Sequence, residues 1–481
     1  MFTLDFPRRR SLGRILPWLA LLASALVARA AAPTKPNIVF ILADDSGYAD
    51  FGCYGHPYAR TPNIDRLAAE GTRFTQFYAT GVTCCPARTG LMTSRWPASY
   101  ATYPANGGFG DRVTITELLR QAGYATGHFG KWHIGPDQKP GTYGIDVIGA
   151  EDDADSRSAK QRQGTRGRDA PIHDDAITFI ERHHDRPFYI NVWGHISHHR
   201  IAPPPSYVEK FKDLVVDETK FSPEMREKFA ICRARGQDVS EHMRRYLADI
   251  FSMDEDIGRL LRRLDELGLR DNTIVVFSSD QGPAPMRPDL DKNADARKKR
   301  GRPVKATPAA DAEYARLDAM GYTGIFRGGK HGMYEGGVRV PFIVRWPGRV
   351  PAGRVDEASV LSGIDWLPTL CALAGVTAPA GIEGEDTSAA WLGRAPHVRG
   401  HPLLWRTSNP NSDAAIREGD WKLTRPGRRG GETELYDVAR DPTESRNVAA
   451  QNPEVTRRLS EKVAAWVATL PKDYVKTSEP P

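Results

Sequence analysis

The sequence predicts an α/β protein: a large, mostly parallel mixed sheet covered by helices on both faces, followed by a small C-terminal α+β domain with an antiparallel sheet and a helix. Two observations point to the large sheet. Short apolar runs recur along the chain, as in strands buried on both faces, and amphipathic helical stretches lie between them. After about residue 385 the pattern changes to short strands and turns that precede one helix, which predicts the second domain.

Residues 1–30 predict an export signal. A basic stretch precedes an apolar run over residues 15–27, and Ala28-Arg29-Ala30 fits the rule for cleavage between small residues. The run is shorter than the roughly 20 residues that span a membrane, so an N-terminal anchor is the weaker interpretation. Arg9-Arg10 before Ser11 is a hint of the twin-arginine route. We therefore expect a periplasmic or secreted protein with no membrane segment in its mature form.

The predicted cleavage changes the charge of the protein. The full chain has 66 basic and 60 acidic residues and a formal charge of +6, which suggests an anionic partner. Cleavage after Ala30 would remove five arginines and one aspartate and leave a charge of +2. Hydrophobic residues at 40% and charged residues at 26% are ordinary globular usage and exclude a disordered chain. Five cysteines in a chain of this length do not make a disulfide scaffold.

The elements follow in order after the signal. Strands are predicted at residues 37–42, 188–192, 273–277 and 340–344, and helices at residues 67–69 after Pro62, 115–122, 246–267 and 453–470. Residues 282–325 are rich in proline, alanine and charge, which predicts a long surface excursion. The expected divisions are a signal at 1–30, an α/β domain at 31–385 and an α+β domain at 386–481.

Acidic side chains follow two of the predicted strands. Asp44 and Asp45 come after the first, and Asp280 and Gln281 come after the third. Ligands of such sheets bind beyond the carboxyl ends of the strands, so we expect these four residues near one another. Adjacent carboxylates repel unless they hold a hard cation. The all-oxygen set suits Ca²⁺ or Mg²⁺ rather than Zn²⁺; solvated loop aspartates are the alternative.

A cysteine motif begins at residue 84. Cys84 and Cys85 precede Pro86, and neighbouring thiols of this kind are usually buried cysteines, or sometimes a vicinal disulfide. The pattern Cys84-x-Pro86-x-Arg88 has a more specific meaning, because it is the recognition sequence for oxidation of Cys84 to formylglycine.

This motif and other segments, in this order, resemble the formylglycine-dependent (type I) sulfatases of the alkaline phosphatase superfamily. The resemblance extends over about residues 35–448, and residues 329–341 are similar to the branch with arylsulfatases and N-acetylgalactosamine-6-sulfatases. The matching segments are residues 43–45, 84–88, 130–135, 195–198, 278–282, 329–330, 335–341 and 434–444.

The resemblance implies a role for each site residue. Cys84, converted by a formylglycine-generating maturation enzyme, would be the nucleophile, acting through a gem-diol and a sulfo-enzyme intermediate. Asp44, Asp45, Asp280, Gln281 and the converted Cys84 would hold Ca²⁺, with Mg²⁺ as the alternative. Arg88 would steady the diol, Lys131 and Lys330 would bind the nucleophile and sulfate oxygens, His133 would be the base, and His198 would protonate the leaving alcohol. His195 is as easily structural as functional.

Four positions depart from the family pattern. Ala87 stands where serine is usual, and Thr93-Ser94 replaces the usual Thr-Gly after the motif. Gln281 stands in place of the commoner asparagine, so its amide oxygen is carried on a longer side chain. Ser197 replaces a frequent proline. The core of the maturation motif is intact, which favours conversion of Cys84.

The expected function is hydrolysis of sulfate monoesters by an exported sulfuric ester hydrolase. A sulfated sugar is the preferred substrate and aryl sulfates are surrogates; both choices rest on analogy. One alternative is a phosphatase or phosphodiesterase of the same superfamily, which would need more His and Asp ligands for two zinc ions. Another is a silent relative with unconverted Cys84. Residues 298–305 resemble a basic hook for the DNA minor groove. Because the protein is expected to be exported, we expect no nucleic-acid partner. The oligomeric state stays open.

Overall fold

The computed structural model describes residues 1–3, 35–102, 108–135, 139–149, 166–199, 201–286, 317–406, 412–427, 430–472 and 474. Residues 36–481 form one compact unit, separate from residues 1–35. The predicted signal lies almost entirely outside the described residues, as do most of the predicted excursion at 282–325 and the basic stretch at 298–305. Among the described helices, none has the length and hydropathy of a membrane span.

In the described part of the chain, nine strands form the central sheet in the order β4-β3-β5-β1-β6-β7-β2-β8, with β9 also paired to β2. Strand pairs are parallel except at β7, which runs antiparallel to both β6 and β2. The strands are β1 Asn37–Ala43, β2 Thr72–Tyr78, β3 Ala125–Gly130, β4 Val147–Ile148, β5 Phe188–Trp193, β6 Thr273–Ser279, β7 Arg339–Arg345, β8 Arg354–Asp356 and β9 Leu361–Ser362. The predicted mostly parallel mixed sheet is confirmed.

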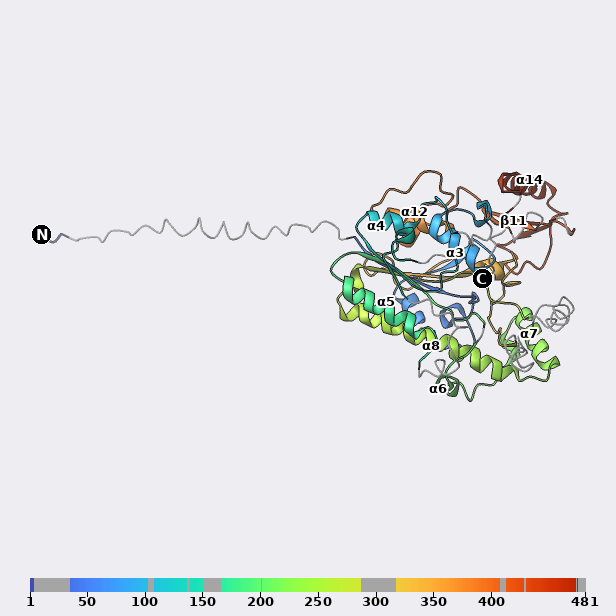
Figure 1. Ribbon diagram of the computed structural model, residues 1–481, viewed down its shortest axis with the longest axis horizontal. Helices are drawn as coiled ribbons and strands as arrows, with labels where there is room; N and C mark the ends of the chain where they lie inside the picture. Colours follow the sequence, from blue (N-terminus) through green and yellow to red (C-terminus); the bar gives the residue numbers. More distant parts are fainter. Residues whose placement is uncertain are drawn as a thin grey trace. The chain divides into compact units, whose positions relative to one another are not determined.

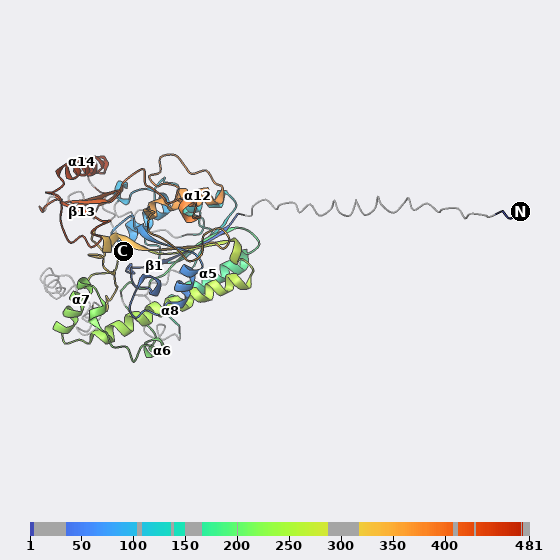
Figure 2. The ribbon, with the colours of Figure 1, turned by 180° about the vertical axis from the view of Figure 1, so that it is seen from behind.

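Helices cover both faces of this sheet because successive side chains of its strands point to opposite sides. Val39 and Ile41 of β1 pack with α2, α5 and α8, whereas Ile38 and Phe40 pack with α3, α4 and α12. Figures 1 and 2 show these two helix layers on either side of the strands. The helices are α2 Pro62–Ala69, α3 Cys84–Thr93, α4 Ile115–Gln121, α5 Ala170–His183, α8 Val239–Glu266 and α12 Trp366–Ala374.

A second sheet follows near the C-terminus. It is antiparallel, in the order β10-β11-β12-β13, and one helix, α14, packs on it through Leu459 and Val463. Its elements are β10 Leu403–Arg406, β11 Ala414–Glu418, β12 Trp421–Arg425, β13 Glu434–Asp437 and α14 Pro453–Thr469. The same apolar cluster includes Val82 and Met333 of the larger part of the unit. The antiparallel sheet and its helix agree with the predicted α+β region, while the boundary at 385/386 stays a prediction.

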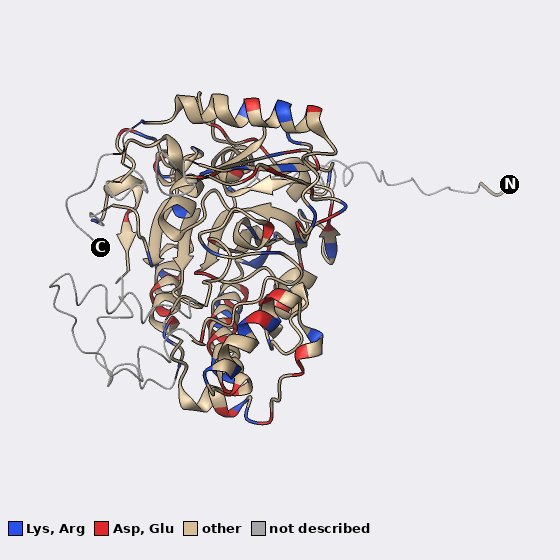
Figure 3. Ribbon diagram, turned by 90° about the vertical axis from the view of Figure 1, so that its right-hand side faces the viewer, with Lys and Arg blue, Asp and Glu red and all other residues tan. Residues whose placement is uncertain are grey.

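The remaining described helices lie in the connections between these elements, and α7, with 12 residues, is the longest of them. The α-helices are α6 Pro205–Glu209, α7 Pro223–Ala234, α11 Glu335–Val338 and α13 Ser388–Trp391. The 3₁₀ turns are η2 Gly52–Tyr54, η3 Pro97–Ser99, η4 Thr142–Gly144, η6 Glu218–Lys220, η7 Arg270–Asn272 and η8 Gly363–Asp365. Basic and acidic residues are interspersed along the described elements in Figure 3, in keeping with a small net charge.

The predicted elements recur with modest changes of boundary. The four predicted strands are β1, β5, β6 and β7, and the predicted helices are α2, α4, α8 and α14. The largest shift is at α8, which begins at Val239 rather than at residue 246. Its first turn is capped by the Asp238 side chain, which accepts a hydrogen bond from the Ser240 N–H. Such a cap satisfies a free backbone donor and extends the helix beyond its apolar pattern.

Candidate active site

The site lies where β1 and β6 end. These strands are parallel neighbours with Ala43 opposite Ser279, so the residues that follow them meet at one edge of the sheet. The Asp45 N–H donates to Asp280 Oδ1 at 3.1 Å, and the Gln281 amide Nε2 donates to Asp45 Oδ1. The structure thus brings together Asp44, Asp45, Asp280 and Gln281, all of them buried.

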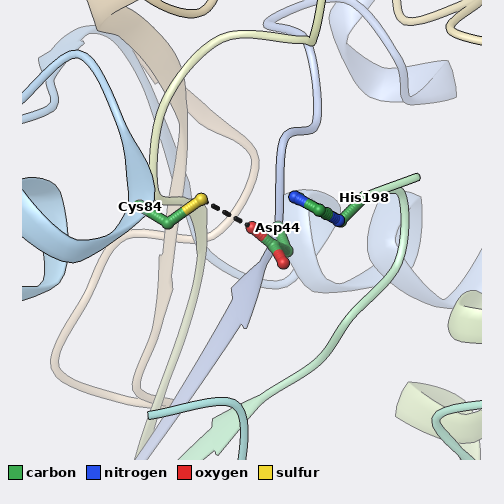
Figure 4. Close-up of side chains that lie close together, drawn as sticks. All are labelled: Asp44, Cys84 and His198. Carbon is green, nitrogen blue, oxygen red and sulfur yellow. Dashed lines mark hydrogen bonds between the residues drawn. The ribbon is translucent and has the colours of Figure 1, made fainter. Parts of the chain in front are cut away.

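Cys84 faces these acids from the first residue of α3. Its Sγ donates to Asp44 Oδ1 at 3.3 Å and to Asp45 Oδ1 at 3.5 Å, and the Lys330 ammonium lies 3.3 Å from it. Figure 4 shows the thiol pointing at Asp44, with the His198 ring on the other side of that carboxylate. Cys84 is only 2% exposed. Burial and the charge of Asp44 raise the pKa of its thiol well above the usual value.

Three cations surround the acids. Arg88 lies one turn after Cys84 on the same face of α3, and its guanidinium donates to Asp280 Oδ2 at 3.0 Å and to the Lys131 carbonyl at 2.7 Å. The Lys131 ammonium donates to Asp44 Oδ2 at 2.6 Å. The Lys330 ammonium donates to both oxygens of Asp45 at 2.7 Å. Each carboxylate is therefore held by its own cation.

The acids respond differently to this environment. Burial raises the pKa of Asp44, but the charges of Lys131, His198 and Arg88 outweigh it and hold the pKa well below the usual value. Burial and the neighbouring charge of Asp44 raise the pKa of Asp280 to about 7. The ionised form of Asp280 is thus costly in this surrounding, and a further positive charge would favour it.

The donor set fits a hard divalent cation. One ligand atom from each of Asp44, Asp45, Cys84 and Asp280 lies within 4.8 Å of the others. In addition, the Gln281 Oε1 atom is buried and has no hydrogen-bond partner among the described residues. Carboxylate and amide oxygens are typical ligands of Ca²⁺ and Mg²⁺.

The two predicted catalytic histidines differ in their surroundings. His198 Nε2 lies 3.8 Å from Asp45 Oδ2, and the side chain is 38% exposed. His133 is exposed, has a φ of 61° and makes no hydrogen bond to the site acids or to Cys84 within the described ranges. Desolvation and the nearby cations Lys131 and Arg88 lower the pKa of His133 to about 4.

Arg168 and Asp169 also belong to the site, although no sequence motif indicates a role for them. They contact the turn of residues 195–198, which carries His198. Their one local signal is that Asp169 precedes Ala170-Pro171 at the start of α5, as many helix caps do. His195 contributes its backbone to these contacts, and His199 lies 3.5 Å from Asp318.

Comparison with known proteins defines the family. Residues 36–376 match the sulfatase family model, and residues 321–468 match the model for the C-terminal region of N-sulphoglucosamine sulphohydrolase. The chain therefore belongs to the sulfatase family. It is an enzyme that hydrolyses sulfate esters, and the predicted family and enzyme class are confirmed.

Individual relatives agree with this assignment. N-acetylgalactosamine-6-O-sulfatase of Bacteroides thetaiotaomicron is 30% identical, over 89% of this chain and 92% of its own. Human arylsulfatase A is also 30% identical, over 92% of this chain and 89% of its own. A protein solved in complex with its substrate D-glucosamine-2-N,6-O-disulfate is 23% identical, with a TM-score of 0.67 over 91% of this chain and 98% of that one. This last likeness concerns the fold.

Proposed function

We propose that the protein is an exported sulfatase that removes sulfate from sugars, with formylglycine made from Cys84 as its nucleophile. The observation that carries this proposal is the place of Cys84. Its Sγ lies within 3.3–3.5 Å of Asp44, Asp45 and Lys330 at the buried start of α3. A hydroxyl in the place of Sγ would meet both an acceptor for its proton and a cation for the sulfate.

The proposed chemistry has two stages. One hydroxyl of the hydrated aldehyde attacks sulfur as the new O–S bond forms and the ester S–O bond breaks. Its proton passes to Asp280, whose pKa is raised to about 7 and which has a carboxylate oxygen within 4.8 Å of Sγ. The leaving oxygen takes a proton from His198 and departs as an alcohol. The second hydroxyl then gives its proton to His133, the C–O bond to sulfate breaks, and sulfate leaves. Water adds to the regenerated aldehyde, the proton taken up in the first stage returns to His198, and His133 releases its proton to solvent.

The remaining residues stabilise charge and hold the acids in place. Lys131 and Lys330 lie beside Asp44 and Asp45 and provide donors for the sulfate oxygens. Arg88, fully buried, fixes Asp280. Asp44, Asp45, Asp280 and Gln281 would hold Ca²⁺, or Mg²⁺, which when bound supplies positive charge beside the nucleophile and the sulfate.

The two histidines differ in position and not in the direction of their pKa, which desolvation lowers in both. His198 is partly exposed beside Asp45, so an alcohol that it protonates has a route to solvent. The lowered pKa of His133 keeps that ring neutral at pH 7, and a neutral imidazole can accept a proton.

A sugar is the proposed carrier of the sulfate. Support comes from the N-acetylgalactosamine-6-O-sulfatase that is 30% identical over 89% of this chain. Export to the periplasm or medium rests on residues 1–30, and conversion of Cys84 by a maturation enzyme rests on the intact Cys84-x-Pro86-x-Arg88 motif.

Turnover of paired model substrates tests the proposal. The wild-type protein, with conversion of Cys84 measured by mass spectrometry, should hydrolyse 4-nitrophenyl sulfate faster than 4-nitrophenyl phosphate. Cys84→Ala should abolish sulfate turnover, whereas Cys53→Ala, a cysteine outside the site, should retain it. Faster phosphate turnover that survives Cys84→Ala would contradict the proposal. A panel of defined sulfated mono- and oligosaccharides then tests the sugar class.

A further inference from the structure

The turn of residues 195–198 carries His198 and is bound on two sides. On one side it pairs with the backbone of a metal-site acid: the Asp44 N–H donates to the Ile196 carbonyl at 2.9 Å, and the Ser197 N–H donates to the Asp44 carbonyl at 2.7 Å. On the other side it meets two consecutive residues, Arg168 and Asp169, which precede α5.

Asp169 binds the donors of this turn. Its carboxylate accepts from the His195 N–H at 3.0 Å and from the Ile196 N–H at 3.1 Å. Asp169 occupies the N-cap position of α5, yet its side chain makes no cap hydrogen bond to that helix. An aspartate at this position ordinarily binds the N–H groups of its own first turn. Here the carboxylate is committed to the turn instead.

A glycine makes this approach possible. A Cβ atom on Gly194 would lie 2.3 Å from Asp169 Oδ2, far inside van der Waals contact. Because Gly194 has no side chain, the Asp169 carboxylate has room to reach the turn.

Arg168 binds the acceptors of the same turn. Its guanidinium donates to the His195 carbonyl at 2.9 Å and to the His198 carbonyl at 2.7 Å. It also lies 3.2 Å from the buried Asp249 carboxylate of α8, which fixes it from behind. The side chain of Arg168 is 12% exposed and that of Asp249 is fully buried. The charged group is thus held with little freedom to move.

From these contacts we infer that Arg168 and Asp169 are positioning residues for His198. Together they bind two backbone donors of the turn, the N–H groups of His195 and Ile196, and two acceptors, the carbonyls of His195 and His198. They therefore set where the His198 ring stands relative to the acids. The inference rests on the proposed role of His198 as the acid that protonates the leaving alcohol. A displacement of about 1 Å at a reacting group can cost roughly 100-fold in rate.

Leaving-group dependence separates positioning from a general loss of structure. 4-Nitrophenolate leaves without a proton, whereas phenolate, a poorer leaving group, needs one. The measured quantity is the ratio of kcat on phenyl sulfate to kcat on 4-nitrophenyl sulfate. Arg168→Met should lower this ratio by about 10- to 100-fold, with KM for 4-nitrophenyl sulfate changed by less than about threefold. Arg168→Lys, which keeps one cationic donor, should give an intermediate ratio and serves if the methionine variant does not fold.

Two controls complete the experiment. Arg166→Met changes an arginine two residues earlier, which pairs with Asp174 at the surface, and should leave the ratio unchanged. Combining Arg168→Met with His198→Ala should lower the ratio no further than His198→Ala alone, because both changes remove the same function. An equal loss on both substrates for Arg168→Met and Arg168→Lys, or a fully additive double variant, would overturn the inference. If His198→Ala itself leaves the ratio unchanged, the proposed role of His198 fails instead.

Discussion

The Gln281 side chain contacts Asp45 and Cys84, and its buried amide oxygen has no hydrogen-bond partner in the described part of the chain. A buried polar atom of this kind costs free energy until something binds it. A divalent cation held by the neighbouring acids is the group that would do so. Gln281 in place of the usual asparagine therefore changes the length of this side chain, but the atom available to the metal is still an amide oxygen.

Metal binding can be measured through stability at this residue. After removal of metal with a chelator, added Ca²⁺ should raise the Tm of the wild-type protein, because it binds the folded state. Gln281→Ala should raise the Ca²⁺ concentration of the half-maximal shift about tenfold, or about 1.4 kcal/mol in binding free energy. Gln451→Ala, an exposed glutamine outside the site, is the matched control. An unchanged midpoint in Gln281→Ala would exclude this side chain as a ligand.

Residues at the ends of strands could be predicted, whereas contacts across loops could not. Asp44 and Asp280 come together because β1 and β6 are parallel neighbours, which follows from a general rule about such sheets. Arg168 and His198 are 30 residues apart and meet through a side chain and a carbonyl, which no periodicity encodes. His133 was expected from its motif, but its exposed, left-handed conformation could not be read from it.

At the scale of elements, α3 is packed tightly against the connection that joins β2 to it. A Cβ atom on Gly90 would lie 2.2 Å from Thr80 Oγ1, the hydroxyl that donates to the Ala87 carbonyl at 2.8 Å. The helix that presents Cys84 and Arg88 can therefore approach this close only with glycine at position 90.

Gly90→Ala tests this packing against helix propensity. Alanine favours an isolated helix over glycine by about 1 kcal/mol, but overpacking a core costs about 1–3 kcal/mol. We expect a net loss of unfolding free energy in urea and a fall in kcat, because α3 must move with its nucleophile. Combination with Thr80→Gly should relieve the clash, giving a favourable coupling in a double-mutant cycle. A variant more stable than wild type would show that α3 is not constrained here.

Strand positions were easier to predict than strand directions. The apolar run that became β7 looks like the others, yet β7 is antiparallel to β6 and β2. Direction depends on the long connection before the strand, and most of that connection carries no apolar pattern. The short strands β4, β8 and β9 each have only two or three residues, too few for any periodicity.

At the scale of the whole compact unit, a buried ionic cluster joins the two sheets. Lys422 of β12 lies 2.9 Å from Glu335 Oε1 and 3.0 Å from Glu444 Oε1, with all three side chains fully buried. Glu335 belongs to α11, five residues after Lys330, and its other oxygen accepts from Tyr78 OH at 2.7 Å. Against burial, the charges of Lys422 and Arg339 lower the pKa of Glu335 to about 2.

Lys422→Met should destabilise the protein by about 3–5 kcal/mol, because it leaves the buried Glu444 without Lys422 and Glu335 with Arg339 as its remaining ion-pair partner. Burial raises the pKa of Glu444 to about 7 even beside Lys422, and the loss of this cation would raise it further above the unfolded value. The loss should therefore be largest at pH 8 and smaller at pH 5, where a carboxyl can be protonated. Lys462→Met removes a surface partner of Glu418 and should cost less than about 1 kcal/mol. Equal losses for the two variants in urea unfolding at pH 8 would rule out the cluster as a link between the sheets.

The burial of α3 also determines whether oxidation of Cys84 comes before or after folding. All ten of its residues, Cys84 to Thr93, are enclosed in the folded chain. A maturation enzyme that recognises Cys84, Pro86 and Arg88 needs those side chains and their backbone to be accessible. If Cys84 is converted as proposed, the oxidation has to be finished while this segment is still unfolded. A chain that folds first would keep a thiol that the maturation enzyme can no longer reach.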